Sequence, residues 1–423
     1  MSKKAIFQQL ILDAIASDLS HVIPRTFRLP LNLPKVISLM GPRRAGKTHI
    51  LLDGINQLRE QIPRNRAIYI NLEDDRLFPL QLNEMDDLIQ GYYELFPENK
   101  SHTVHFFLDE VQEIAHWEKF IRRIFDQENC HVYITGSSSG LLGKEIATSL
   151  RGRTLPFEVL PLSFNEFLSF NKIDEDPRSS KGKATTIHYL KQYLLQGGFP
   201  ELLFLPEQFH QRTIEEYLEL MLYKDLVDRH KMRHPHVAKY LLKQLMNLTG
   251  RLMSLNKVYN DIKSQGHAVS KSTIYEYTAN MVDAYMIVEV PLWTSSIRKQ
   301  QVNPTKMYGI DPSFKHAMIP NMDWGQTCEQ VVCLELLRRG HTPYYLKGHQ
   351  EVDFYIEEGS LINVCYDLNN PNTLKREINS LLEGMEMMEQ DTSLLISWDK
   401  EETITQNGCT IHVQPLWKWL LKI

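Results

Sequence analysis

The sequence predicts an α/β protein that begins with a parallel sheet carrying helices on both faces. Two observations lead to this prediction: short runs rich in apolar and β-branched residues, and helical stretches between them. The runs lie at residues 35–40, 67–73, 104–110 and 130–137. Buried strands that alternate with helices favour a parallel sheet, because the helices that connect the strands cover its faces.

The remainder of the chain predicts a helical region followed by a second mixed region. Residues 171–186 are polar, contain Pro, Gly and Ser, and are typical of a surface loop or linker. Apolar residues then recur at three- and four-residue spacing up to about residue 250, which predicts helices. A helix, a turn, a helix and two strands follow between residues 254 and 311, and mixed α/β sequence completes the chain. We therefore expect three domains, at residues 1–170, 187–320 and 322–423.

Composition excludes several classes of protein. The 423 residues are 43% hydrophobic and 23% charged, which excludes a disordered or fibrous chain. The formal charge of −5 requires any nucleic-acid site to be a local basic patch. Five scattered cysteines without a CxxC pair disfavour zinc and disulfides. No apolar run reaches the roughly 18 residues of a membrane span, and the amino end resembles an amphipathic helix. We expect a cytoplasmic protein with no membrane partner.

The strongest motif is a phosphate-binding loop of the form GxxxxGK[ST], the Walker A motif. It follows the first predicted strand and opens a helix, the setting that this motif requires. Lys47 would reach the β- and γ-phosphates of a nucleotide, and the Thr48 hydroxyl would hold Mg²⁺. The motif and the next residue are the predicted nucleotide-binding residues: Gly41, Pro42, Arg43, Arg44, Ala45, Gly46, Lys47, Thr48 and His49.

A second motif, of the Walker B type, lies at the end of the third strand. Asp109 and Glu110 follow the apolar run at residues 105–108, about sixty residues after the loop. Asp109 would orient Mg²⁺ together with Thr48, and Glu110 would polarise the attacking water. The alternative is a solvated strand end. A nucleotide switch does not need Glu110, so its presence favours hydrolysis.

Three further residues are candidates for catalysis. Ser137, or Ser138 after it, follows the fourth strand and would sense the γ-phosphate, or would cap the next helix. Arg151 and Arg153 precede the strand at residues 155–162. Either arginine would neutralise charge on a transferring phosphoryl group, within the chain or across a subunit boundary, or would be a solvated surface charge.

The order of these motifs resembles that of a known family. GPRRAGKT, YINLEDDR, FFLDEVQ, ITGSSSGLL, LRGRTLPFEVLPLSFNEFL and GGFPE follow one another, and GHQEVDF lies near the carboxyl end. Together they resemble the bacterial and archaeal AAA-type ATPases that carry a carboxy-terminal domain of unknown function. The resemblance implies a P-loop ATPase domain that binds ATP, a winged-helix segment and a restriction-endonuclease-like fold. Glu73, Asp74 and Asp75 match the family's second strand end, near the nucleotide cleft.

The predicted winged-helix segment has a basic environment. A capped helix begins at Ser270, and residues 285–291 and 306–310 would form the wing strands. Eight basic residues face only Asp225 and Asp228 over the same stretch, and such a patch could contact duplex DNA or surround a protein-contact bundle. The basic residues are Lys224, Arg229, Lys231, Arg233, Lys239, Lys243, Arg251 and Lys257. The spacing of His230, His234 and His236 does not favour zinc.

The nuclease-like end lacks two groups that cleavage needs. Glu329 and Asp353 match the family's helix and strand carboxylates. Asn363 and Cys365 occupy the positions of a second acid and a lysine. Asn is a poor ligand for a hard cation, and Cys supplies no fixed positive charge. We expect a nuclease-like scaffold that does not cleave.

Three functional hypotheses follow. The first is an ATPase, dependent on ATP and Mg²⁺, that uses nucleotide state to control its carboxy-terminal domains in a process coupled to DNA or defence. The second is an ATP-switched protein-interaction module, and the third is an ATP-regulated nuclease. A GTPase is disfavoured because no NKxD-like sequence is present. An arginine that acts across a subunit boundary would require a homo-oligomer.

Overall fold

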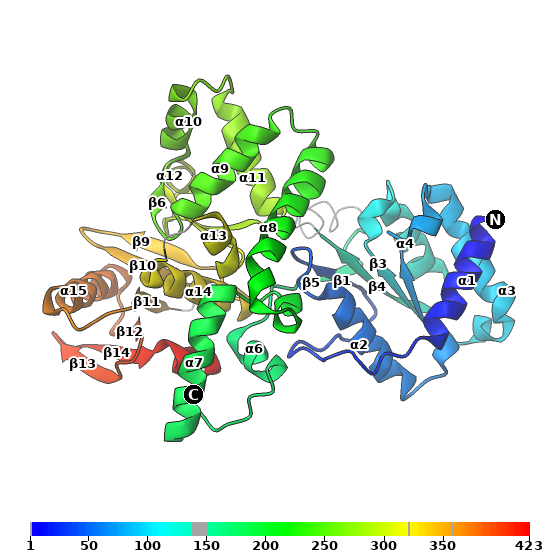
Figure 1. Cartoon of the computed structure of the whole chain (residues 1–423), viewed down its shortest axis with the longest axis horizontal. Coiled ribbons are helices and arrows are strands. Elements are labelled where there is room, and N and C mark those ends of the chain that lie inside the picture. Colours follow the sequence, from blue (N-terminus) through cyan, green and yellow to red (C-terminus); the bar gives the residue numbers. More distant parts are fainter. Residues whose placement is uncertain (1, 138–149, 320–321, 358) are drawn as a thin grey trace. The chain divides into compact units, whose positions relative to one another are not determined.

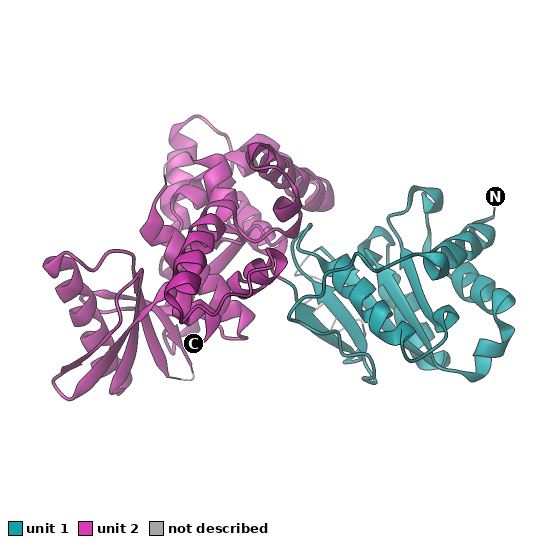
Figure 2. Cartoon of the chain, turned by 60° about the horizontal axis from the view of Figure 1, so that its bottom comes forward, with its two compact units in different colours: residues 1–159 teal, residues 160–423 magenta. Residues whose placement is uncertain are grey.

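The structure is a computed structural model that describes residues 2–137, 150–319, 322–357 and 359–423. The chain divides into two compact units, residues 1–159 and 160–423 (Figure 2). The predicted first domain extended to residue 170. Helix α6 (Phe164–Phe170) instead packs in the second unit, where Phe164 and Phe167 are buried in its core.

A parallel five-stranded sheet forms the centre of the first unit. Its order is β2-β3-β4-β1-β5, and every neighbouring pair is parallel. Figure 1 labels β1, β3, β4 and β5 of this sheet. All residues of β1 and β3 are buried, as expected for strands covered on both faces. The predicted α/β class is therefore confirmed. The strands are β1 (Val36–Met40), β2 (Ala67–Asn71), β3 (Val104–Asp109), β4 (Cys130–Gly136) and β5 (Thr154–Glu158).

Four α-helices within the described residues accompany this sheet. They are α1 (Lys3–Ala16), α2 (Lys47–Arg59), α3 (Asp86–Leu95) and α4 (Trp117–Gln127). The connection from β1 to β2 runs in one direction along the sheet, and the connections through β3 to β4 run back. Right-handed crossovers therefore place α2 on one face and α3 and α4 on the other. The predicted amino-terminal helix is α1, which contacts α3 and buries Phe7, Leu10 and Ile11.

The second unit begins with helices. Its first part contains α6, α7 (Ser180–Gln196), α8 (His210–Leu220), a π-helix (Met221–Asp228) and α9 (Pro235–Asn247). The predicted linker at residues 171–186 is partly helical, because α7 begins within it. Ser179 caps this helix by accepting a 3.0 Å hydrogen bond from the backbone N–H of Gly182. Among the described residues, no helix is both long and apolar enough to cross a bilayer.

Helices and a small antiparallel sheet follow. The two helices and two strands expected from the sequence are present, together with an additional strand at residues 252–253 and an additional helix at residues 297–302. The elements are β6 (Leu252–Met253), α10 (Leu255–Ser264), α11 (Lys271–Asp283), β7 (Ile287–Val290), α12 (Ile297–Val302) and β8 (Thr305–Gly309). The sheet order is β6-β8-β7. Ser270 caps α11 by accepting a hydrogen bond of 3.1 Å from the N–H of Thr273. Strands β7 and β8 match the two predicted wing strands.

A six-stranded mixed sheet completes the chain, in the order β13-β14-β12-β11-β10-β9. Its core is continuous with the preceding helices and strands: Val290 and Tyr308 pack in one cluster with Phe354. For this reason the two predicted carboxy-terminal domains fall in one compact unit. The elements are α13 (Pro312–Met318), α14 (Trp324–Arg338), β9 (Tyr344–Lys347), β10 (Glu351–Ile356), β11 (Ser360–Cys365), α15 (Pro371–Met388), β12 (Thr392–Ser397), β13 (Glu402–Gln406), β14 (Cys409–Pro415) and α16 (Leu416–Leu421).

Candidate functional site

The phosphate loop connects the carboxyl end of β1 to the amino end of α2. Gly41 lies so close to the end of β5 that an added Cβ would stand 2.0 Å from the carbonyl oxygen of Val159. Only glycine fits there. Arg25, which the sequence did not single out, donates a 2.9 Å hydrogen bond to the carbonyl of Ala45 and supports the loop from outside.

Lys47 is folded beneath this loop. Its side chain donates to the carbonyl oxygens of Gly41 at 2.9 Å and Pro42 at 3.0 Å, and the residue is only 4% exposed. An ammonium has three donors and no acceptor, so phosphate oxygens placed in the loop would compete with these carbonyls for it. The loop therefore holds a cation where the motif requires one.

The acidic end of β3 lies directly beside the first turn of α2. Oδ2 of Asp109 accepts a hydrogen bond of 2.7 Å from the Thr48 hydroxyl and one of 2.8 Å from the Tyr69 hydroxyl. The Thr135 hydroxyl donates to its other oxygen, Oδ1. Asp109 is 2% exposed, so these three donors hold a buried carboxylate in one orientation. Burial, with the nearby charge of Asp109, raises the pKa of Tyr69, which keeps this donor protonated.

Glu110 points differently from Asp109 because the chain turns at this residue. Its φ is +56°, in the left-handed region, which ends the strand. Its backbone N–H donates to the Thr135 hydroxyl at 2.9 Å, and the Gln112 amide donates to its carboxylate. Glu110 is half-buried, so one side remains open to solvent. A second carboxylate thus stands beside the predicted magnesium residues.

These groups fit Mg²⁺ bound with a nucleotide. Thr48 and Asp109 offer hard oxygen ligands 2.7 Å apart at the start of α2. Within the described ranges, no group of three or more His, Cys, Asp or Glu side chains is arranged to hold a metal ion.

The remaining residues of the loop and its surroundings have other neighbours. Arg43 faces Glu73 with 3.9 Å between charged atoms, so one residue of the acidic triplet lies near the loop. Asp74 instead pairs with Arg76. Arg44 and His49 are exposed.

The predicted sensor lies at the carboxyl-terminal ends of the strands, where the phosphate loop also lies. Ser137 is buried directly after β4, whose last residue, Gly136, is paired with Met40 at the end of β1. It therefore lies close to the beginning of the phosphate loop. The alternative sensor, Ser138, falls outside the described residues.

The two predicted arginines lie at the amino-terminal ends of the strands, whereas the phosphate loop lies at the carboxyl-terminal ends. Arg153 precedes β5, and its carbonyl accepts a hydrogen bond from the N–H of Val36 at the beginning of β1. Its guanidinium donates to Asp126 at 2.7 Å. Strands β1 and β5 are parallel, so their amino ends are separated from the loop by the length of β1, about 15 Å. Arg151 is exposed near the same end. The structure does not bring these arginines to their own phosphate loop.

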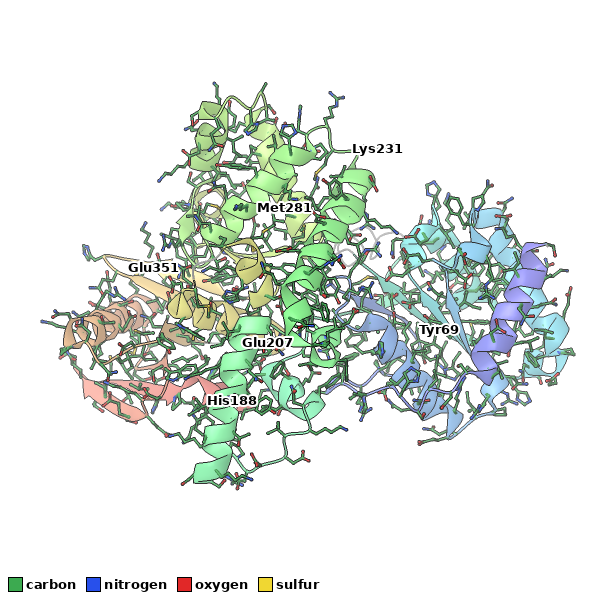
Figure 3. The ribbon with its side chains drawn as sticks, in the orientation of Figure 1. Tyr69, His188, Glu207, Lys231, Met281 and Glu351 are labelled. Carbon is green, nitrogen blue, oxygen red and sulfur yellow. The ribbon has the colours of Figure 1, made fainter. Side chains whose placement is uncertain are left out.

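Sequence reasoning missed three residues that support the site: Arg25, Tyr69 and Thr135. Tyr69 lies on β2 (Figure 3) and Thr135 on β4, the two neighbours of β3. The feature of the sequence that could have identified Tyr69 and Thr135 is a hydroxyl side chain on each of the two strands. It becomes informative only when the strand order is known.

The basic stretch of the second unit is largely exposed. Seven of its eight basic residues have exposed side chains, including Lys231 (Figure 3), and Arg229 is half-buried. Lys239 pairs with Glu219 at 2.9 Å. The ring centroids of His234 and His236 lie 6.0 Å apart, and those of His236 and His267 lie 5.5 Å apart.

Comparison with known proteins agrees with this geometry. Residues 33–168, which carry the loop and the acidic strand end, match the AAA domain, and residues 187–324 match a domain of unknown function. An uncharacterized protein of Methanocaldococcus jannaschii is 35% identical over 437 residues, covering 100% of this chain and 96% of that protein. The chain belongs to this family of AAA-domain proteins.

Other relatives of the AAA-domain protein are more distant. An uncharacterized protein of Haemophilus influenzae is 26% identical over 325 residues, which are 76% of this chain and 78% of that protein. The solved structure of Aeropyrum pernix ORC1 in complex with DNA is 12% identical, with a TM-score of 0.33, and covers 75% of this chain and 91% of that one. The match to the AAA domain confirms the resemblance to AAA-type P-loop ATPases.

Proposed function

We propose that this AAA-domain protein binds ATP with Mg²⁺ and hydrolyses it at the phosphate loop. The observation that carries the proposal is the contact between the Thr48 hydroxyl and the buried carboxylate of Asp109, with the ammonium of Lys47 beneath the same loop. These groups supply the cation and the magnesium ligands that phosphoryl transfer requires. Bound Mg²⁺ would neutralise charge on the phosphates.

The protein's own residues would divide the remaining work. Lys47 would leave the carbonyls of Gly41 and Pro42 and bind phosphate oxygens. Glu110, half-buried and held by Gln112, would orient the attacking water. Ser137 would contact the γ-phosphate from the end of β4. Arg151 or Arg153 would act only on the nucleotide of a second copy, because both lie far from the loop of their own chain.

The test is ATP turnover by the full chain, with Lys47→Ala and Glu110→Gln. We expect Lys47→Ala to lose both binding and turnover. Glu110→Gln should bind ATP and turn it over at least about a hundredfold more slowly, because general-base catalysis contributes about 10²–10⁴-fold.

Matched controls are Lys35→Ala and Glu113→Gln. Lys35 is a lysine at the other end of β1 that bonds to the Gly152 carbonyl, and Glu113 is an exposed glutamate three residues after Glu110. Both controls should retain turnover. Turnover that survives Lys47→Ala would contradict the proposal.

The exposed basic stretch favours a second element of the function, in which duplex DNA contacts the second unit and the nucleotide state controls that contact. Lysine and arginine that neutralise phosphates make affinity fall steeply with salt. We expect DNA to raise ATP turnover at about 50 mM salt and to lose this effect at about 200 mM. Lys231→Glu with Arg233→Glu should abolish the stimulation and leave basal turnover intact.

Turnover indifferent to DNA at both salt concentrations would instead favour the ATP-switched protein-interaction module. Measurement of the oligomeric state with and without ATP then becomes the deciding experiment. Mg²⁺-dependent DNA cleavage lost in Asp353→Ala would favour the ATP-regulated nuclease.

A further inference from the structure

A hollow of about 530 Å³ lies within the second unit. Its lining comes from α14, β10, β11 and α15. Four of the lining residues are acidic: Glu329, Glu351, Asp353 and Glu377. Arg376, also in the lining, lies 2.6 Å from Glu377 and compensates that carboxylate. The other three acids need a second cation, because like charges at close range destabilise one another.

The chain supplies that cation itself. Lys306, on β8, is 1% exposed, and its ammonium lies 2.9 Å from Glu329, 2.7 Å from Glu351 and 2.8 Å from Asp353. The three carboxylates come from α14 and from the first half of β10, where Figure 3 labels Glu351. One ammonium therefore joins the small antiparallel sheet to a helix and a strand of the carboxy-terminal region.

The number of partners matches the chemistry of the group. An ammonium has three N–H donors, and three carboxylates stand within reach of it. Burial lowers the pKa of Lys306, but the three carboxylates oppose this and raise the pKa well above its ordinary value. Glu329 also accepts a hydrogen bond of 2.7 Å from the Tyr308 hydroxyl, and burial raises the pKa of Glu329 to about 7. The lysine remains charged while one acid carries less than a full charge near neutrality.

Asn363 and Cys365, at the predicted acid and lysine positions, do not interact with Lys306. The Asn363 amide donates to Glu377 at 2.8 Å, and its oxygen accepts from the backbone N–H of Asp353 at 3.1 Å. Burial raises the pKa of Cys365 to about 11, so the thiol is neutral. Neither residue supplies charge to the carboxylates.

We propose that the Lys306 ammonium takes the place of a divalent cation among Glu329, Glu351 and Asp353, so that this carboxylate site is complete without metal. The site then serves to hold β8 against β10 and α14. It excludes divalent ions because the position between the carboxylates is filled. The proposal is independent of ATP hydrolysis, which uses residues of the first unit.

The experiment measures Mn²⁺ binding to the full chain without nucleotide, from the loss of the free-ion electron paramagnetic resonance signal. The wild type and Asp353→Asn should bind equally. Lys306→Met should gain a site at least tenfold tighter than any in the wild type, and Lys306→Met/Glu351→Gln/Asp353→Asn, which keeps a single carboxylate, should lose it. Lys315→Met is the matched control, because Lys315 is also a buried lysine of this unit but donates to Gln326. It should gain no site.

Removing Lys306 leaves three carboxylates together and can prevent folding, so a second variant is included. Lys306→Met/Glu329→Gln retains only two of the three charges, and it should also gain Mn²⁺ binding. Wild-type Mn²⁺ binding that disappears in Asp353→Asn would overturn the proposal, since metal and lysine would then share the site. A folded Lys306→Met chain that gains no Mn²⁺ site would overturn it as well.

Discussion

The Tyr69 hydroxyl lies 2.8 Å from Oδ2 of Asp109 and donates a hydrogen bond to it. The same oxygen accepts from Thr48, and the Thr135 hydroxyl donates to the other oxygen. Residues of β2, β4 and α2 thus determine the orientation of a carboxylate on β3. Tyr69 and Thr135 are positioning residues in this arrangement, since they act through Asp109.

Tyr69→Phe should therefore weaken the use of Mg²⁺. Hydrogen bonds to charged groups contribute about 1.5–3 kcal/mol, so we expect a loss of about tenfold or more in turnover at limiting Mg²⁺. Excess Mg²⁺ should restore part of it. The measurement is turnover against Mg²⁺ concentration. Tyr92→Phe is the control, because the Tyr92 hydroxyl bonds to the Asn65 carbonyl instead. An unchanged Mg²⁺ dependence in Tyr69→Phe would show that Asp109 needs no such support.

The position of Arg151 at the far edge of the sheet leads to a complementation test. Arg151→Ala should bind ATP normally but lose turnover if the arginine acts on a second copy. Mixing Arg151→Ala with Lys47→Ala should then restore part of the activity, because one variant supplies an intact loop and the other an intact arginine. The same mixture is prepared with Arg153→Ala. Loss of turnover without recovery in either mixture would exclude an arginine donated between copies.

Gly197, in the GGFPE sequence, illustrates a structural reason for one of the family-like motifs. Its φ is +76°, and an added Cβ would stand 1.7 Å from the carboxylate of Asp311. That carboxylate accepts a hydrogen bond of 2.8 Å from the Gly198 N–H. Gly197→Ala should therefore lower the free energy of unfolding by more than about 2 kcal/mol. Gly266→Ala is the control: its φ is +86°, but no described atom lies within 4 Å of the new Cβ.

The two variants are compared by urea denaturation followed by circular dichroism. Gly266→Ala should cost only about 1 kcal/mol, because it adds backbone strain without a collision. Equal losses in the two variants would mean that Asp311 moves aside at little cost.

The lowered pKa of His105 leads us to expect that acid reduces the stability of the first unit. Burial, with the neighbouring His131, lowers the pKa of His105 from 6.5 to about 4. The folded protein keeps this imidazole neutral while the unfolded chain protonates it below about pH 6.5. The stability contribution is therefore present above pH 6.5 and is lost as the pH falls towards 4, by at most about 3 kcal/mol.

His105→Phe removes this titration and keeps an aromatic ring in the core. The hydroxyl of Tyr133, 3.2 Å from the imidazole, retains the Leu31 carbonyl as a partner. The urea midpoint of the variant should fall less than that of the wild type between pH 6.5 and 4. Parallel pH profiles would contradict the assignment to His105.

Local motifs of the site were predictable from the sequence. The phosphate loop is a run of eight residues between a strand and a helix, and Asp109 and Glu110 are consecutive at the end of an apolar strand. Such features depend on neighbours in the chain, so their chemistry follows from residue type and spacing. The predicted linker at residues 171–186 failed in part, because the Ser179 cap starts a helix inside a polar stretch.

Contacts between distant residues were not predictable in this way. The sequence alone determined the α/β class, the phosphate loop and the acidic strand end, and the family resemblance singled out Glu329 and Asp353 of the second unit. Only the tertiary structure decided that Tyr69 and Thr135 flank Asp109, that Arg151 and Arg153 lie at the other edge of the sheet, and that Lys306 stands among three acids. The physical reason is that strand order and register, set by burial of whole faces, choose which distant side chains meet.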